Sequence, residues 1–153
     1  MQKLNFPTYE FRLSKNEEGQ VYIFDELRKK NLLLTPEEWV RQHILRYLIE
    51  EKGYPRSLIS AEAGLKVNQL SRRYDALIYN RRGEPVLLIE CKAPSVPVNQ
   101  EVFDQVIAYN RELKASHLLV SNGLKHYCCR IDPGSDHYVF LEEIPVFELL
   151  NRL

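Results

Sequence analysis

The hydrophobic pattern of the chain predicts many short strands interrupted by two helices. Apolar residues at helical spacing predict one helix that begins after Thr35 and a second from about Gln100 to Lys114. A terminal helical turn is predicted at Val146–Leu150. The element order is hairpin, helix, three strands, helix and strands, which predicts an α/β fold with a mixed sheet. The predicted strands are Tyr9–Lys15, Gln20–Phe24, Ser57–Ala63, Arg73–Tyr79, Pro85–Lys92, His117–Ser121, His126–Ile131 and His137–Leu141.

The first helix carries clear start and stop signals. Thr35 is a typical N-cap, Pro36 suits the first turn, and Glu38 has the spacing of a capping-box glutamate. Gly53 predicts the end of the helix, because glycine readily adopts the left-handed conformation found there.

An acid and an arginine fall on the inward face of this helix. At about 100° per residue, Glu37 and Arg41 share an arc with apolar residues such as Val40 and Ile44. Two interpretations remain open. The two residues could form an i,i+4 ion pair, or Glu37 could reach into a polar pocket.

Two later strands bring acidic residues together. Glu90 and Lys92 end an apolar strand and point the same way, about 7 Å apart by strand rise. A two-residue turn centred on Arg82-Gly83 pairs residues whose numbers sum to 165, and therefore places Asp75 opposite Glu90. Two carboxylates at that separation repel unless a proton or cation lies between them. A divalent metal is the natural occupant.

Composition predicts one compact intracellular domain. The 153 residues are 44% hydrophobic, and 21 Lys and Arg balance 21 Asp and Glu, so no net charge attracts polyanions. Three cysteines and no apolar run of ~18 residues indicate a reducing, cytoplasmic setting. The sequence has no glycine-rich phosphate loop ending in Lys-Ser/Thr, so an ATP-driven motor would have to be a separate subunit.

Four local patterns together resemble the PD-(D/E)xK nuclease superfamily, and most closely the N-terminal domain of type I restriction enzyme R subunits. The resemblance covers about Phe24 to Ile131. Tyr74 stands where the superfamily name has proline, a position that varies widely. The patterns are LTPEEWVRQ (34–42), RRYDALIY (72–79), LLIECKAP (87–94) and EVFDQVIAYN (101–110).

This resemblance implies metal-dependent hydrolysis of DNA phosphodiesters. Asp75, Glu90 and the Cys91 backbone carbonyl would bind Mg²⁺, for which Mn²⁺ could substitute. Lys92 would orient or deprotonate the attacking water, although it could instead form only a salt bridge. Glu37 would serve a second metal, and Gln105 would hold a water or Lys92 in place.

The resemblance also implies a restriction-endonuclease-like αβββαβ core with flanking helices. The predicted layout of the single domain, residues 1–153, is an N-terminal hairpin (1–24), a core (25–131) and a C-terminal segment (132–153). The DNA-contact candidates are Arg72, Arg73 and Arg41. The predicted partners are DNA, a second copy of the chain, and separate motor or specificity subunits. The alternative is a non-catalytic module that binds nucleic acid or a protein.

Overall fold

The computed structural model describes residues 1–61, 64–67 and 70–153, with side-chain surroundings for all but 62–73. In chain order the elements are β1 (Leu13–Lys15), β2 (Val21–Asp25), β3 (Lys30–Leu33), α1 (Pro36–Lys52), η1 (Arg56–Leu58), β4 (Ile59–Ala61), β5 (Gly64–Val67), β6 (Leu70–Arg73), β7 (Ala76–Tyr79), β8 (Pro85–Cys91), α2 (Gln100–Leu113), β9 (His117–Ser121), β10 (His126–Ile131), β11 (Tyr138–Leu141) and α3 (Phe147–Asn151).

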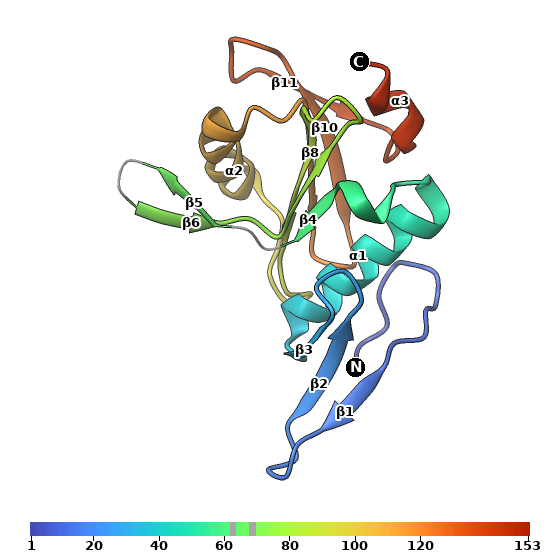
Figure 1. Ribbon diagram of the computed structural model, residues 1–153. Coiled ribbons are helices and arrows are strands. Elements are labelled where there is room, and N and C mark those ends of the chain that lie inside the picture. Colours follow the sequence, from blue (N-terminus) through green and yellow to red (C-terminus); the bar gives the residue numbers. More distant parts are fainter. Residues whose placement is uncertain (62–63, 68–69) are drawn as a thin grey trace.

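Within the described chain, six strands form a central sheet in the order β11-β10-β9-β8-β7-β4. The β8–β9 pair is parallel and the other pairs are antiparallel. The parallel pair is joined by α2, which supplies the crossover that parallel strands need. The fold is therefore α/β with a mixed central sheet, and α1 and α2 lie on opposite sides of it (Figure 1).

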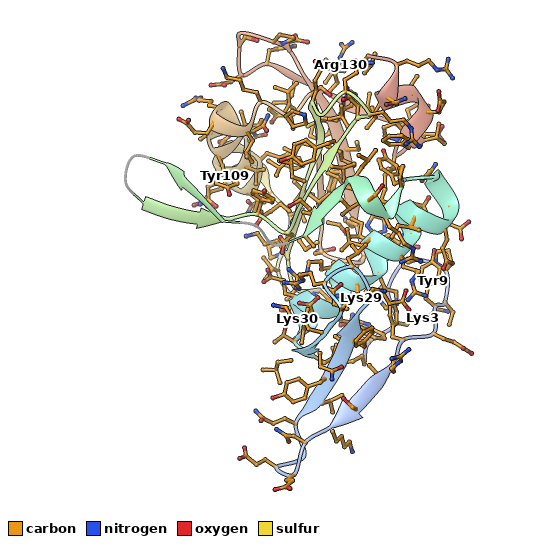
Figure 2. All side chains as sticks on the ribbon, viewed as in Figure 1. Lys3, Tyr9, Lys29, Lys30, Tyr109 and Arg130 are labelled. Atoms are coloured by element: carbon orange, nitrogen blue, oxygen red, sulfur yellow. The ribbon has the colours of Figure 1, made fainter. Side chains whose placement is uncertain are left out.

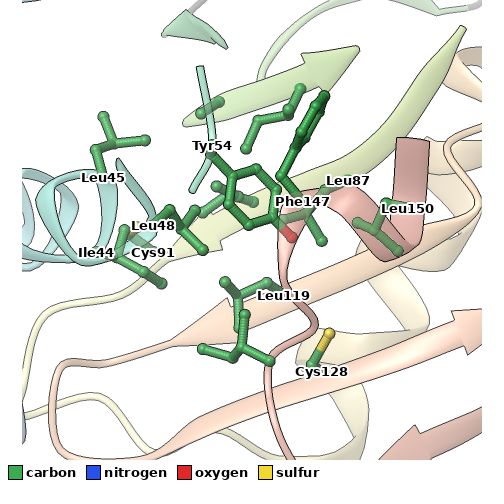
Figure 3. Packing of buried hydrophobic residues seen from close by; sticks show 14 of the residues in the cluster. Ile44, Leu45, Leu48, Tyr54, Leu87, Cys91, Leu119, Cys128, Phe147 and Leu150 are labelled. Carbon is green, nitrogen blue, oxygen red and sulfur yellow. The ribbon is translucent and has the colours of Figure 1, made fainter. Parts of the chain in front are cut away.

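The two faces of the sheet bury separate apolar clusters. The first cluster packs α1 and α3 against one face, and Figure 3 shows Leu48, Leu87 and Leu150 within it. The second packs α2 against the other face, with Leu88 and Val106 among its members. Because β8 alternates between the two clusters, nearly all its side chains are buried, as its continuous apolar run predicts.

Helix α1 begins and ends where the sequence signals predict. The Thr35 hydroxyl accepts a hydrogen bond from the Glu38 amide at 3.0 Å. Gly53 ends the helix at a φ of 72°, and its amide donates to the Leu48 carbonyl. A side chain other than glycine would be strained there. The capping box is only half formed, because the Glu38 side chain turns away to other partners.

The β7–β8 hairpin has the predicted register but a different turn. Ala76 pairs with Ile89, and Leu77 pairs with Leu88, so residues near the end of β8 still sum to 165. The connection is not a two-residue turn, because the Asn80 amide bonds to the Glu84 carbonyl and Gly83 has a φ of 81°. A bulge between Ile78 and Tyr79 compensates for the longer loop by adding one residue on the β8 side.

The N-terminal region is a three-stranded sheet rather than a hairpin. β1, β2 and β3 form a sheet of their own that extends from the body of the molecule (Figure 1). β1 begins at Leu13 instead of Tyr9. Tyr9 and Phe11 instead place their rings near His43 on α1, with centroids 6.2 and 4.9 Å away. Lys29 and Lys30 lie at the turn between β2 and β3 (Figure 2).

The C-terminal segment belongs to the core, which corrects the predicted end of the core at residue 131. β11 extends the central sheet beyond β10, and Phe147 and Leu150 of α3 are buried in the first cluster. The Tyr54 hydroxyl also donates to the Pro145 carbonyl at 2.7 Å, which ties this segment to the end of α1. Leu4 joins the same cluster from the N-terminal side.

One further hairpin was not predicted. β5 and β6 form a two-stranded sheet that projects away from the central sheet (Figure 1). The strand predicted at Ser57–Ala63 starts as the short helix η1 and continues as β4. Its last two predicted residues, 62 and 63, lie outside the described residues. Within the described part of the chain, no helix has the length and apolar character needed to cross a membrane.

Candidate active site

One side of the candidate site is formed by a buried ion pair in the first turns of α1. Arg41 and Glu38 are one helical turn apart, and their side chains are only 4% and 9% exposed. The Arg41 Nε donates to one Glu38 oxygen at 3.0 Å, and its Nη2 donates to the other. The Gln42 amide adds a bond of 2.9 Å to Glu38. This network fixes the guanidinium, because a buried charge is tolerated only with such partners.

Asp75 approaches β8 at the end of the sheet, directly before β7. The chain bends at Asp75, and β7 begins only at Ala76, so β8 extends past its antiparallel partner. Asp75 Oδ2 accepts a hydrogen bond from the Cys91 amide at 2.7 Å and thereby takes the place of a ladder acceptor. The backbone amide and carbonyl of one residue in a strand point to the same side. The Cys91 carbonyl therefore faces the side on which Asp75 lies.

The bend changes how Asp75 meets Glu90. If the strand alternation continued, Tyr74 would join Ala76 on the α1 side of the sheet. Tyr74 instead packs in the α2-side cluster, with its ring centroid 6.3 Å from that of Tyr109, which lies on α2 (Figure 2). The expectation that Asp75 stands across from Glu90 within a continuous strand is therefore corrected. The two carboxylates come together at the end of the sheet.

Glu90 and Lys92 lie at the end of β8 and project together, as the sequence predicts. The Lys92 Nζ is 3.5 Å from Glu90 Oε1. Both side chains are half-buried, at 29% and 19% exposure. The Lys92 amide continues the β8–β9 ladder by donating to the Ser121 carbonyl at 2.8 Å. Lys92 is therefore held by its backbone, while its ammonium lies at the mouth of the site.

The electrostatics of both acids are strongly perturbed. Burial raises the pKa of Asp75 from 3.8 to about 6, and Glu37 adds to the rise, while the Cys91 amide and Arg41 oppose it. Burial also raises the pKa of Glu90 from 4.5 to about 7, with Asp75 as the next cause. Lys92 opposes this second rise. Two neighbouring acids whose charged forms are disfavoured make a place where a cation is strongly favoured.

A small hollow connects Asp75 with the start of α1. It has a volume of about 250 Å³ and is lined by Thr35, Glu37, Glu38, Arg41 and Asp75. Its walls therefore carry three carboxylates and one guanidinium. The hollow is open to solvent on the side of Glu37, whose side chain is exposed.

Comparison with known proteins decides the family. A family model described as the N terminus of type I restriction enzyme R proteins matches residues 36–145, which include every charged residue of the site. The chain belongs to this family. A search of curated proteins finds no match.

A solved structure supports the shared fold. A fragment of a putative HsdR subunit of a type I restriction enzyme from Vibrio vulnificus YJ016 superposes with a TM-score of 0.55 at 20% identity. The match covers 78% of this chain and 25% of that chain. The R-protein domain described above thus spans about a quarter of the length of that relative.

Within this R-protein domain, the structure brings some of the predicted residues together and not others. Asp75, Glu90, Lys92 and the Cys91 backbone meet at one end of the sheet. Glu37 lines the same hollow as Asp75, but its side chain is exposed. Its predicted role remains a prediction.

Gln105 lies on the exposed face of α2, so a role in holding Lys92 or a water also remains a prediction. The predicted DNA contact of Arg41 is corrected, because its guanidinium is buried and bound to Glu38. Arg72 and Arg73 fall in β6, directly before the site, but their side chains lie outside what the structure describes.

Sequence reasoning missed Glu38 as a member of the site. It was interpreted as a capping partner, while Glu37 was expected either to pair with Arg41 or to reach into a polar pocket. The signal that could have found it is the spacing of Glu38, Arg41 and Gln42. These positions at i, i+3 and i+4 form one face, on which a carboxylate can bind two donors at once.

The arrangement fits one hard cation only in part. In the part of the chain that the structure describes, no three His, Cys, Asp or Glu side chains are arranged so that together they could hold a metal ion. Two carboxylates and a backbone carbonyl converge instead, and all are hard oxygen donors of the kind that Mg²⁺ prefers. Mg²⁺ usually keeps several waters and binds only one or two carboxylates. The donor set is therefore of a type that Mg²⁺ accepts.

Proposed function

We propose that this R-protein domain is a metal-dependent endodeoxyribonuclease with a restriction-endonuclease-like core of the PD-(D/E)xK type. The observation that carries the proposal is the meeting of two partly buried acids with raised pKa values, Asp75 and Glu90, beside Lys92. Acids in such a state are a common feature of functional sites. Family membership supports a nuclease and does not favour the alternative of a non-catalytic module.

Asp75, Glu90 and the Cys91 carbonyl are the proposed ligands of Mg²⁺, or of Mn²⁺ in its place. The Cys91 amide holds Asp75 in position, so one carboxylate oxygen is oriented by the backbone of β8 itself. When bound, the metal polarises a phosphoryl oxygen and lowers the pKa of a bound water. Glu37 approaches the same hollow and would hold a water there.

Lys92 is the proposed catalytic cation. Its ammonium lies 3.5 Å from Glu90, so it can orient a water or offset the negative charge that develops on the phosphoryl oxygens. Gln105 is proposed to position a water or Lys92 when DNA is bound. Gln105 is exposed, so its amide is accessible to a water or to bound DNA.

DNA is the proposed substrate, reached through the β5–β6 hairpin. β6 ends with Arg72 and Arg73, and Arg73 is two residues before Asp75. Two basic residues therefore directly precede the site in the chain. Such residues would contact phosphates and set the position of the duplex. We further propose that the domain works in the cytoplasm, as a dimer or with separate motor and specificity subunits.

A plasmid assay tests the proposed function. Purified protein is incubated with supercoiled plasmid and Mg²⁺, alongside Asp75→Asn, Lys92→Met and a control with a chelator. The proposal predicts nicked or linear DNA with the wild type only. Cleavage that persists in both variants would overturn it, as would a wild type that binds Mg²⁺ and cuts no form of DNA.

A further inference from the structure

The charges around the site follow a simple balance. Four carboxylates face it, namely Asp75, Glu90, Glu37 and Glu38. Two cationic groups, those of Arg41 and Lys92, are paired with them. Four negative and two positive charges leave a net charge of −2, which one divalent ion neutralises.

Arg41 places a fixed positive charge in the wall of the hollow, beside Asp75. Its guanidinium lines the hollow together with Asp75 and opposes the repulsion that Asp75 receives from Glu37 and Glu38. The guanidinium donates to both oxygens of the Glu38 carboxylate, and the Gln42 amide donates to the same carboxylate. A group fixed in this way is a permanent part of the wall.

We propose that this site takes a single divalent cation and that Arg41, held by Glu38, stands in place of a second one. The inference rests on the proposed function, since it concerns the same metal. It assigns Arg41 a positioning role inside the site, in place of the DNA contact expected from the sequence.

Two physical arguments support a single ion. The first is charge: a second divalent ion would leave an excess of +2 in a partly buried site, and uncompensated buried charge is strongly unfavourable. The second is ligand supply. Both oxygens of Glu38 already accept hydrogen bonds, from Arg41 and Gln42, so this carboxylate has little capacity left for a metal. Of the two α1 carboxylates that line the hollow, only that of Glu37 then remains for a second ion.

The test counts bound Mn²⁺ in the full chain without DNA. Mn²⁺ is titrated at pH 8 by calorimetry, and free Mn²⁺ is followed in parallel by electron paramagnetic resonance. Four proteins are compared: wild type, Glu38→Gln, Arg41→Gln, and the double variant with both changes. The double variant is the matched control, because it loses one charge of each sign and keeps the net charge at −2. Circular dichroism confirms that each variant is folded.

The charge balance predicts a definite order. Wild type and the double variant bind one ion with similar affinity. Glu38→Gln, with a net charge of −1, binds one ion on the order of tenfold more weakly. Arg41→Gln, with a net charge of −3, binds Mn²⁺ on the order of tenfold more tightly or takes up a second ion.

The outcomes separate the inference from the proposed function. Two ions bound to the wild type overturn the inference and leave metal-dependent cleavage standing. A double variant that behaves like Glu38→Gln also overturns it, because charge balance then does not control binding. A wild type that binds no Mn²⁺ overturns both proposals. If Arg41→Gln does not fold, the ion count of the wild type and the affinities of Glu38→Gln and the double variant still decide.

Discussion

The two ends of the β7–β8 hairpin carry similar charged residues in opposite electrostatic states. At the turn end, Glu84 is exposed, and hydrogen bonds from Asn80 and Arg82 lower the pKa of its carboxyl. At the other end, burial raises the pKa of Asp75 to about 6 and that of Glu90 to about 7. The same pair of strands thus stabilises the charged form of one acid and penalises that of two others.

This contrast shows which end is specialised. At the turn, local side chains satisfy the carboxylate, so its charge contributes to folding. At the site end, the acids are partly buried, and the loss of hydration that raises their pKa values disfavours their charged forms. Proteins depart from favourable electrostatics of this kind mainly at functional sites. The predictions that follow test the contrast, from the largest expected effect to the smallest.

The largest effect is expected for Lys92→Met, compared with Lys125→Met as a matched control. Removing the Lys92 ammonium should lower the rate of plasmid cleavage on the order of a thousandfold, because it removes the proposed catalytic cation. The exposed Lys125 lies outside the site, and its change should leave the rate within about twofold. Similar rates for the two variants would contradict the assignment of Lys92.

The two neighbouring glutamates of α1 should differ in their effect on stability. Glu38→Ala leaves the buried Arg41 guanidinium without its carboxylate and should lower the free energy of unfolding by about 3 kcal/mol. Glu37→Ala removes an exposed side chain and should change it by less than about 0.5 kcal/mol. Urea denaturation of both variants measures the difference. Equal effects would mean that the ion pair does not stabilise α1.

The acids at the site end should make the metal-free protein less stable as the pH rises. Their pKa values are higher in the folded than in the unfolded chain, so the folded state binds more protons between about pH 4 and pH 7. The stability that these two protonated acids contribute is therefore fully present below pH 4 and is lost as the pH rises through 6 to 7. The loss is at most about 3 kcal/mol per group.

Asp75→Asn provides the check on this pH dependence. Thermal unfolding in a chelator should show the variant several degrees more stable than the wild type at pH 8, and no more stable at pH 4. The asparagine oxygen can still accept the Cys91 amide, so the local structure is kept. A variant that is less stable than the wild type at pH 8 would contradict the claim that the charged form of Asp75 destabilises the folded protein.

The smallest effect is expected at the turn end, with the opposite sign. The pKa of Glu84 is lowered by folding, so its contribution to stability is present above its usual value of 4.5 and lost as the pH falls. Glu84→Gln should make the protein slightly less stable than the wild type at pH 7 and equal to it at pH 3. Thermal unfolding at the two pH values tests this, and a stabilised variant at pH 7 would contradict it.

Much of the fold follows from the sequence because its signals are local. Thr35 and Gly53 bound α1 as predicted, and the strands β9 and β10 have the predicted ends. β3 was missed because it is a short and largely exposed strand without a clear alternation. The β5–β6 hairpin was also missed, and the strand predicted at Arg73–Tyr79 included the last residue of β6.

The site was predicted in outline but not in geometry. The register from Ala76–Ile89 to Ile78–Leu87 is the predicted one because a longer loop and a bulge offset each other, which no rule of turn length foresees. The bend at Asp75 and the inward turn of Glu38 depend on packing against other elements. Helical spacing placed Glu37 rather than Glu38 on the inward face, whereas the structure buries Glu38 and leaves Glu37 exposed.

The most direct test of the central claim is the affinity of Mn²⁺ for wild type and for Asp75→Asn, measured by calorimetry at pH 8. If Asp75 and Glu90 form a metal centre, the wild type binds Mn²⁺ and the variant binds it at least about a hundredfold more weakly. Equal affinity in the two proteins, or no binding to the wild type, would contradict a metal centre at this end of the β7–β8 hairpin.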